Sequence, residues 1–335
     1  MVPMTTFTMN ADARAPWGRA LVTGGAGFLG SHLCTRLLDS DVEVDCVDNL
    51  STGRAEKVAH LAGRPGFRFL ERDIADADSV DALTGPYDLV LHLAGPTAPA
   101  DGPERPREVL DAGSLGTRNA LTVADRDGAR FLLASSPEAH GDDSWDGTDP
   151  VVPYSAYCEA TRFSEALVAA HAGDGSNAGI VRLFTAYGPR MRTDDGRMIS
   201  TCIEQALSGG PVTVPGDGGR RLSLCYVDDM VDGVLLLAAS RSVRPVDIGG
   251  DEETTAEQIA RRVIDLTGSE APLTFVDGPD GPLGRGAPDT GFAHELFGWT
   301  QRVPWEEGLE RTLASFTAPP ERTPAVVGRG GEWPA

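Results

Sequence analysis

The peptide YSAYCEATR at residues 154–162 contains a tyrosine that could transfer a proton. Tyr157 precedes Thr161 by four residues, so on a helix the two side chains share one face. An unperturbed phenol titrates near pH 10, so at pH 7 only about one molecule in a thousand is phenolate, a deficit of roughly 4 kcal/mol. A catalytic tyrosine usually has a cation beside it, whereas Thr161 offers a hydroxyl. The alternative is a core aromatic side chain on an amphipathic helix that also carries Ala160 and Phe163.

A glycine-rich turn near the start of the chain is a candidate phosphate site. The apolar run RALVT at 19–23 leads directly into TGGAGFLGSHL, in which Gly24, Gly27 and Gly30 form the pattern GxxGxxG. Such glycines allow a tight turn, and a pyrophosphate then lies at the N-terminus of the following helix. Taken alone, the pattern is also compatible with a strand–helix turn that binds nothing.

Asp48 strengthens the dinucleotide interpretation. It ends the second apolar run, 18 residues after Gly30, near the spacing of the carboxylate that holds the adenosine ribose hydroxyls. This carboxylate would repel a 2′-phosphate, so NAD is favoured over NADP. The following NLSTG at 49–53 adds hydroxyl and amide donors, and Asp73 with Ile74 could flank the adenine.

The elements that must hold these residues alternate along the chain. Short apolar runs at 19–23, 42–48, 67–74, 88–94, 130–136 and 178–184 read as strands, and amphipathic stretches such as Leu29, Leu33 and Leu37 read as helices between them. This alternation predicts an α/β fold, a Rossmann-type doubly wound parallel sheet covered on both faces. We expect a flexible leader at 1–16, a mainly NAD-binding domain at 17–190, a smaller, interleaved substrate-binding lobe mainly from 191–317, and a disordered tail at 318–335.

Composition excludes several classes of partner. The formal net charge of -21 disfavours nucleic acid and anionic membranes, and no run is apolar enough to cross a membrane. The start of the chain lacks the features of a signal peptide, and the five scattered cysteines predict reduced thiols in a cytoplasmic protein. The six histidines show no metal-ligand spacing, so no metal site is expected.

Several segments together carry a family resemblance over roughly residues 18–317. They are TGGAGFLG, VDNLSTG, RDI, HLAG at 92–95, LLASS at 132–136, the Tyr157 segment, GPRM at 188–191, DDGR at 194–197 and YVDDM at 226–230. The chain resembles the extended short-chain dehydrogenase/reductase family, the NAD-dependent epimerases and dehydratases of nucleotide sugars. HLAGPTAP, SSPEAHGD and GPRMRTDDGR are most similar to UDP-glucuronate decarboxylases. In these enzymes NAD oxidises C4 of the sugar acid, the β-keto acid loses carbon dioxide, and the hydride returns.

The resemblance implies roles for individual residues. Ser136 would hydrogen-bond the reacting hydroxyl, Glu138 would be the acidic residue of the decarboxylases, and Tyr157 would be the base. The implied cofactor contacts are Gly24, Gly27, Phe28, Leu29, Gly30, Asp48, Asn49, Ser51, Thr52, Gly53, Asp73, Ile74, Leu93, Ala94, Gly95 and Tyr157. The implied substrate contacts are Thr185, Arg190, Arg197, Arg220 and Arg221. The family also commonly forms homodimers, here through helices near 106–126 and 155–171.

The chain departs from the family at several of these positions. Thr161 replaces the lysine of YxxxK, which in the family anchors the nicotinamide ribose and lowers the pKa of the tyrosine; Arg162 points about 100° away on a helix. His140 replaces a loop tyrosine and could donate a proton near neutral pH, or could be a surface residue. Further departures are Pro137, Thr185, Gly113 and Leu222.

Three functions therefore stay open. The first is an NAD-dependent nucleotide-sugar enzyme that oxidises its substrate transiently, as a decarboxylase or as an epimerase or dehydratase. The second is a non-redox lyase, isomerase or cyclase that uses Glu138, His140 and Tyr157 on a different substrate. The third is a non-catalytic NAD-binding module.

Overall fold

The computed structural model describes residues 15–95, 97, 101, 104–140, 153–173, 177–277 and 287–317. At residues 138, 140 and 153–155 it describes the backbone alone. The expected leader, apart from residues 15 and 16, and the expected tail lie outside the described residues.

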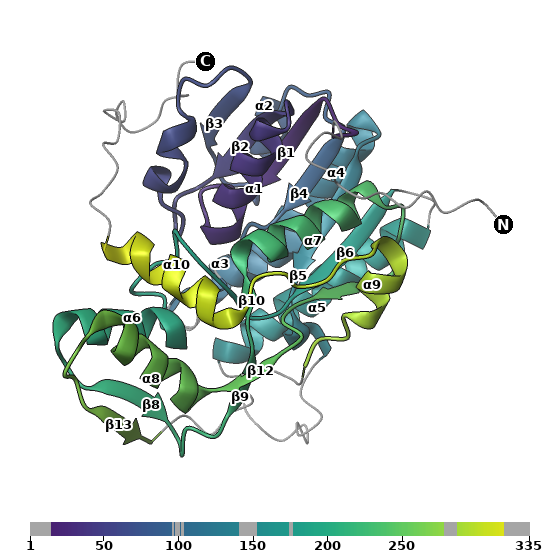
Figure 1. Cartoon of the computed structure of the whole chain (residues 1–335). Helices are drawn as coiled ribbons and strands as arrows, with labels where there is room; N and C mark the ends of the chain where they lie inside the picture. The colour runs from purple at the N-terminus through teal and green to yellow at the C-terminus, as the bar shows by residue number, and fades with distance from the viewer. Residues whose placement is uncertain are drawn as a thin grey trace.

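The centre of the molecule is a seven-stranded sheet in which every neighbouring pair is parallel (Figure 1). Its order is β11-β6-β5-β4-β1-β2-β3. The strands are β1 (Arg19–Thr23), β2 (Glu43–Asp48), β3 (Phe67–Glu71), β4 (Leu89–His92), β5 (Arg130–Ser135), β6 (Ala178–Leu183) and β11 (Val246–Ile248). The expected doubly wound parallel fold is confirmed.

Four strands end earlier than the apolar runs predicted, and one of them is β6, which ends at Leu183 and not at residue 184. The run at 67–74 extends beyond β3, which ends at Glu71, because Asp73 forms a turn: its carboxylate accepts from the Ala75 amide at 2.8 Å. β4 and β5 likewise end at His92 and Ser135, short of the predicted residues 94 and 136. In each case the final apolar or small residues of the run belong to the loop at the carboxyl edge of the sheet.

The sheet separates two layers of helices, each with its own hydrophobic core. On one face α1 (Phe28–Asp39) packs against α7 (Val227–Ala239), and on the other α4 (Thr117–Asp127) contacts α2 (Ala77–Ala82) and α5 (Pro153–Gly173). Side chains alternate between the two cores along a strand: Ala20 and Val22 belong to one and Leu21 to the other. A strand buried on both faces must be apolar throughout, which explains the continuous runs in the sequence.

A smaller lobe lies beyond the carboxyl edge of the sheet (Figure 1). There α6 (Met198–Ser208) packs on α8 (Ala256–Thr267), and β8 (Val212–Pro215) pairs with β13 (Leu273–Val276). Thr255 and Gln258 form a reciprocal capping box at the start of α8. The short pairs β7 (Ala186–Tyr187) with β10 (Cys225–Tyr226) and β9 (Arg221–Ser223) with β12 (Glu253–Thr255), and helices α9 (Gly291–Phe297) and α10 (Trp305–Thr317), complete the second half.

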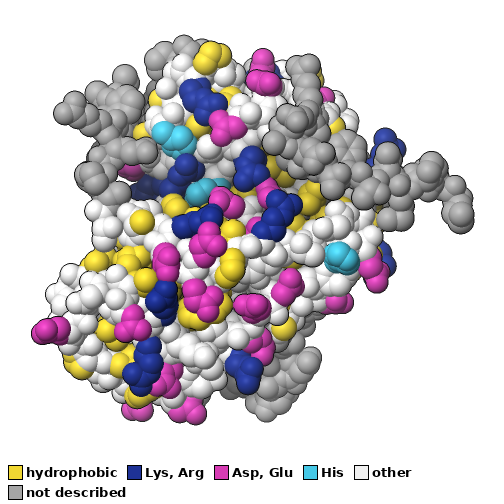
Figure 2. All heavy atoms as spheres, in the orientation of Figure 1, with side chains coloured by type: hydrophobic (Ala, Val, Ile, Leu, Met, Phe, Trp, Pro, Cys, Tyr) yellow, Lys and Arg dark blue, Asp and Glu magenta, His cyan; other side chains and the backbone are white. Residues whose placement is uncertain are grey.

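Chain segments from both halves therefore meet at one edge of the sheet. The strand order reverses between β1 and β4, whose carboxyl ends lead into the glycine turn and into Leu93. In open α/β sheets, ligands bind at such a point of reversal. On the described part of the face in Figure 2, basic and acidic side chains are intermixed.

Candidate active site

A cavity of about 1020 Å³ occupies this edge between the sheet and the smaller lobe. Every residue expected to contact the cofactor lines it, from Gly24 to Tyr157. Of the expected substrate contacts, Thr185, Arg197, Arg220 and Arg221 also line it. The folded chain thus brings predicted site residues that are up to 197 positions apart, from Gly24 to Arg221, to the wall of one cavity.

The glycine turn is sterically closed to larger residues. Gly24 has φ +70°, and a Cβ there would lie 2.7 Å from the carbonyl carbon of Leu93. A Cβ on Gly30 would lie 2.1 Å from the carbonyl oxygen of Gly24. The absence of side chains at Gly24 and Gly30 lets the start of α1 lie close to the ends of β1 and β4. Phe28 and Leu29, in the first turn of α1, line the cavity. The first amide groups of a helix lack intrahelical acceptors, so this end of α1 suits a pyrophosphate.

Asp48 presents a buried carboxylate to the same cavity. Its side chain accepts hydrogen bonds from the backbone amides of Ala26 at 3.0 Å and Leu50 at 2.9 Å. Burial raises the pKa of Asp48 above its ordinary value, and the two amides oppose that rise. Gly53 is required here because a Cβ would lie 2.5 Å from the carboxylate. A ribose with two free hydroxyls can donate to a carboxylate held in this way.

Ser136 and Tyr157 bring two hydroxyls to the other half of the cavity. Ser136 is 7% exposed, and its Oγ has no hydrogen-bond partner among the described residues. A buried hydroxyl without a partner costs about 1–3 kcal/mol. Tyr157, on α5, is half-buried and lines the cavity together with Ser136. A bound ligand with a hydroxyl group could hydrogen-bond to Ser136 and so remove the cost of its unpaired hydroxyl.

Thr161 does not direct its hydroxyl toward the cavity. Its Oγ1 donates to the backbone carbonyl of Tyr157 at 2.8 Å, the usual i to i−4 bond of a helical threonine. Thr161 instead lines a separate cavity of about 60 Å³, whose described lining residues include no lysine or arginine. Arg162 is exposed and pairs with Glu159 at 3.3 Å, as its helical direction predicted.

Two expected catalytic side chains cannot be placed. Glu138 and His140 lie in the short helix η4 (Pro137–His140), but their side chains fall outside the described residues. Their catalytic roles stay predictions.

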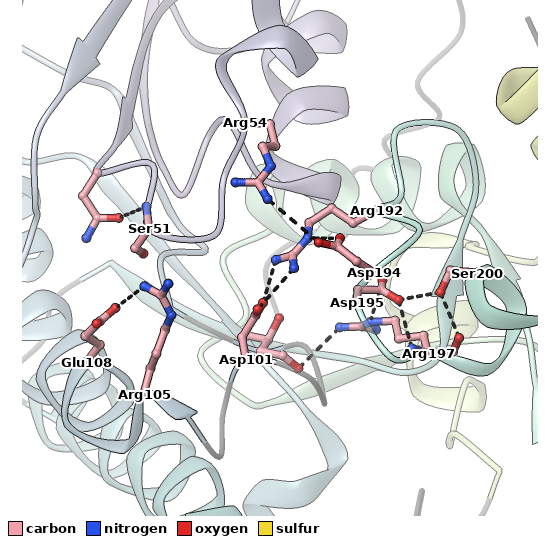
Figure 3. Close-up of polar contacts among 12 residues, drawn as sticks. Ser51, Arg54, Asp101, Arg105, Glu108, Arg192, Asp194, Asp195, Arg197 and Ser200 are labelled. Carbon is pink, nitrogen blue, oxygen red and sulfur yellow. Dashed lines mark hydrogen bonds and ion pairs between the residues drawn. The ribbon is translucent and has the colours of Figure 1, made fainter. Parts of the chain in front are cut away.

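Arginines from the second half of the chain reach the cavity in ion pairs. Arg192 donates to Asp101 at 2.7 Å and to Asp194 at 2.8 Å (Figure 3). Arg197 lies 3.5 Å from Asp195, and Arg221 pairs with Glu253 at 3.2 Å. Figure 3 shows Arg192 between the two carboxylates, with Arg54 directed toward Asp194. The Arg192–Asp101 pair connects the segment after β7 to the segment after β4.

Arg190, an expected substrate contact, lies elsewhere. Its guanidinium donates to the carbonyl of Ser31 at 3.0 Å and to the hydroxyl of Thr35 at 3.1 Å, both on α1. It is not among the described residues that line the cavity. Arg192, two residues later, does line the cavity, although the sequence motif did not point to it.

The departure at Gly113 has a steric explanation. A Cβ there would lie 2.8 Å from the Cβ of Ala160 and 2.9 Å from its carbonyl oxygen. Gly113 lies in the π-helical turn η3 (Ala112–Gly116), where α5 approaches closely, so no asparagine side chain fits on this backbone. Thr185 and Leu222, two other departures, line the cavity.

The sequence analysis missed Lys57, Asp101 and Arg192 as cavity residues. Lys57 carries a signal that was available, because it is the only lysine in the 335 residues. Asp101 and Arg192 carry none, since their pairing depends on two loops that meet only in the folded chain.

The five cysteines are all free, and four are buried. No helix among the described residues is long and apolar enough to span a bilayer.

Comparisons with known proteins agree with this geometry. Residues 20–249 match the NAD dependent epimerase/dehydratase family. The chain is 37% identical over 323 residues to UDP-glucuronic acid decarboxylase 1 of Xenopus tropicalis, covering 94% of this chain and 75% of that protein. It is 36% identical over 318 residues to UDP-glucuronic acid decarboxylase 3 of Arabidopsis thaliana, covering 92% and 91%.

Two solved structures share the fold. UDP-glucose 4-epimerase of Thermotoga maritima has a TM-score of 0.79 at 27% identity, covering 89% of this chain and 98% of that one. UDP-glucuronic acid 4-epimerase of Bacillus cereus, in complex with UDP-glucuronic acid and NAD, has a TM-score of 0.78 at 26% identity, with the same coverage.

Proposed function

Because the chain belongs to the NAD dependent epimerase/dehydratase family, we propose that it is an enzyme that modifies a nucleotide sugar by transient oxidation at the sugar. Decarboxylation of UDP-glucuronate is the leading reaction, since the curated relatives named above are decarboxylases of this sugar nucleotide. Epimerisation is the next candidate, because a solved neighbour is a 4-epimerase of the same compound.

The family and the solved neighbour from Bacillus cereus bind NAD, and the described residues fit this cofactor. The start of α1 suits its pyrophosphate, and the buried Asp48 carboxylate suits a ribose with free hydroxyls. The chemistry that bound NAD would supply here is reversible acceptance of a hydride from the sugar. Leu93, Ala94 and Gly95, after β4, would border its nicotinamide end.

The unpaired Ser136 hydroxyl is the observation that carries the proposal. It is buried, it lines the cavity with Tyr157, and it lacks a partner among the described residues. A sugar hydroxyl placed between Ser136 and Tyr157 would satisfy Ser136 and give its proton to the phenolate. Thr185, Arg197, Arg220 and Arg221 line the side of the smaller lobe and would hold the nucleoside diphosphate.

Thr161 occupies the position at which the family has its YxxxK lysine. Among the described residues, no lysine or arginine lines the small cavity beside Thr161, and the Thr161 hydroxyl donates to the backbone. We therefore expect the rise of turnover with pH to lie at higher pH than in a YxxxK enzyme.

A direct experiment uses UDP-glucuronate labelled with ¹³C at the carboxyl carbon, together with NAD. Release of labelled carbon dioxide supports decarboxylation, and retention of the label with an inverted C4 supports epimerisation. If neither occurs, and absorbance of the reduced cofactor never appears with this or other UDP-sugars, the redox proposal is wrong.

The position of Thr161 favours a second candidate, a non-redox lyase, isomerase or cyclase. Thr161 replaces the lysine that lowers the tyrosine pKa in the family, and a protonated phenol can serve as an acid instead of a base. Turnover with a redox-inactive NAD analogue would establish this candidate. If instead alanine at Glu138, His140 and Tyr157 changes no activity, a non-catalytic NAD-binding module is the better account.

We also propose a homodimer that forms through α3 (Pro106–Asp111) and α5, which pack together. Leu110 on α3, Leu115 on η3 and Phe163 on α5 are 42%, 38% and 51% exposed and could supply apolar contacts to a second copy. The division into a mainly NAD-binding part at 17–190 and a mainly substrate-binding part at 191–317 is likewise a proposal. So is a cytoplasmic location, which the free cysteines support.

A further inference from the structure

Lys57 is the single lysine of a chain with 28 arginines, and it lines the large cavity. It lies on the short helix η1 (Ala55–Leu61), which follows the Asp48 loop. The backbone fixes this helix: the Lys57 amide donates to the carbonyl of Arg54, and the Arg54 amide donates to that of Ala26 in the glycine turn, both at 3.0 Å. Val58 and Leu61 are fully buried beneath it. The position of Lys57 is therefore built into the nucleotide-binding turn.

The ammonium group of Lys57 has no hydrogen bond or ion pair with any residue that the structure describes. Three of the arginines that line the cavity, by contrast, are already paired with carboxylates: Arg192, Arg197 and Arg221. Arg72, which also lines the cavity, is exposed to solvent. Lys57 is thus a half-buried cation in a cavity where three of the arginines already have carboxylate partners. An unpaired buried charge is unfavourable until a counter-ion arrives.

The groups around Lys57 make it responsive to an anion. Burial, helped by Arg192 and Arg54 and opposed by Asp195 and Asp48, lowers the pKa of Lys57 to about 8. The ammonium is therefore only partly protonated slightly above neutral pH, and a phosphate nearby would restore the charge.

Lys57 cannot substitute for the lysine missing at Thr161. It follows β2, whereas Tyr157 borders the small cavity with Leu93 and Ala134, at the ends of β4 and β5. Three strand spacings, about 14 Å, separate β2 from β5 in the sheet. Lys57 belongs to the half of the cavity near Asp48 and the start of α1, where phosphates are expected.

We propose that Lys57 is a ligand for the pyrophosphate of a nucleotide held in this cavity, supplied either by the dinucleotide or by the nucleoside diphosphate of the sugar substrate. The inference rests on the proposed function for the identity of these nucleotides. The contact itself follows from the unpaired cation, its fixed backbone and its place beside Asp48 and Arg192.

The single lysine makes a selective measurement feasible. Reductive methylation with ¹³C-formaldehyde labels Lys57 and otherwise only the terminal amine, and it preserves the charge. We expect the Lys57 methyl resonance to titrate near pH 8 in the free protein. Inorganic pyrophosphate should raise the midpoint by about one pH unit or more. NAD alone and UDP alone are tested separately, and the nucleotide that raises the midpoint identifies which pyrophosphate Lys57 binds. Adenosine and uridine, which have no phosphate, should leave the midpoint unchanged.

Binding measurements on variants give a second readout. Lys57→Met should weaken binding of the responsible nucleotide about tenfold by calorimetry, while Lys57→Arg should restore it. The affinity of the unsubstituted protein should fall above pH 8, and that of Lys57→Arg should not. Arg241→Met removes one exposed charge next to the end of α7 and is the matched control, with unchanged binding expected.

The outcomes separate this inference from the proposed function. If NAD and UDP bind the Lys57→Met variant as tightly as the unsubstituted protein and leave the methyl resonance unmoved, Lys57 is no ligand, while the proposed function stands. If neither nucleotide binds at all, the proposed function fails. Inorganic pyrophosphate then decides: a shifted resonance supports the phosphate site, and an unshifted one overturns it.

Discussion

The hydroxyl of Thr161 donates to the backbone carbonyl of Tyr157 at 2.8 Å, one helical turn earlier on α5. The hydroxyl of the residue that replaces the family's lysine is therefore bonded within its own helix. A cavity of about 60 Å³ remains beside it, bordered by both residues and by His92, Thr117 and Ser164. The structure thus contains room where a longer side chain would extend.

Thr161→Lys is expected to raise turnover at pH 7 at least tenfold and to move the pH optimum downward. The new ammonium would enter the small cavity beside Tyr157 and lower the pKa of its phenol. Initial rates between pH 6 and 10 measure both effects. Thr161→Val is the control and should change little, because the lost hydroxyl contacts only the backbone. Lower turnover in a folded Thr161→Lys variant would show that this site has been remodelled for other chemistry.

Ser136→Ala is expected to separate activity from stability. Losing the hydroxyl that contacts the reacting group should lower kcat/KM about 10²–10⁴-fold. The same change removes a buried oxygen without a partner, so the free energy of unfolding should stay the same or rise by about 1 kcal/mol. Steady-state kinetics and chemical denaturation of one preparation test both statements. A strong loss of stability would mean that Ser136 is a structural residue.

His92 is expected to make folding sensitive to mild acid. It is 2% exposed, and burial lowers its pKa from 6.5 to about 4. Above pH 6.5 the imidazole is neutral in both the folded and the unfolded chain, and between pH 6.5 and 4 only the unfolded chain takes up the proton. The free energy of unfolding should therefore fall by about 3 kcal/mol across this window because of His92.

Denaturation midpoints of His92→Asn at a series of pH values isolate this contribution. The variant should be less stable at pH 7, because His92 contacts the hydroxyls of Thr23 at 2.7 Å and Thr117 at 3.2 Å, but its stability should depend less on pH. His294→Asn on α9, an exposed position, should keep the original pH dependence. Parallel curves for the His92 variant and the unsubstituted protein would contradict this prediction.

Phe163→Glu is expected to produce a monomer. Phe163 is 51% exposed on α5, and a charge in an apolar interface is unfavourable. Light scattering after size-exclusion chromatography gives the mass directly. Leu207→Glu, at a 45% exposed position on α6 in the smaller lobe, should leave the dimer intact. A monomeric unsubstituted protein would end the dimer proposal.

The sequence alone was enough for the architecture and for the part of the cavity wall expected to contact the cofactor. Apolar runs such as RALVT are buried on both faces of a parallel sheet, so their composition reveals them locally. The glycines at 24, 27 and 30 and Asp48 at the end of β2 are likewise recognisable by their spacing, because a phosphate-binding turn needs those residue types at those positions.

Only the tertiary structure decided which side chains were still available for a ligand. Arg190 and Arg192 are equally basic in the sequence, yet one donates to α1 and the other lies in the cavity between Asp101 and Asp194. Thr161 and Ser136 both carry hydroxyls, yet one is used by its helix and the other has no partner among the described residues. Hydrogen bonding and ion pairing depend on the distances between segments far apart along the chain, and residue spacing does not encode these distances.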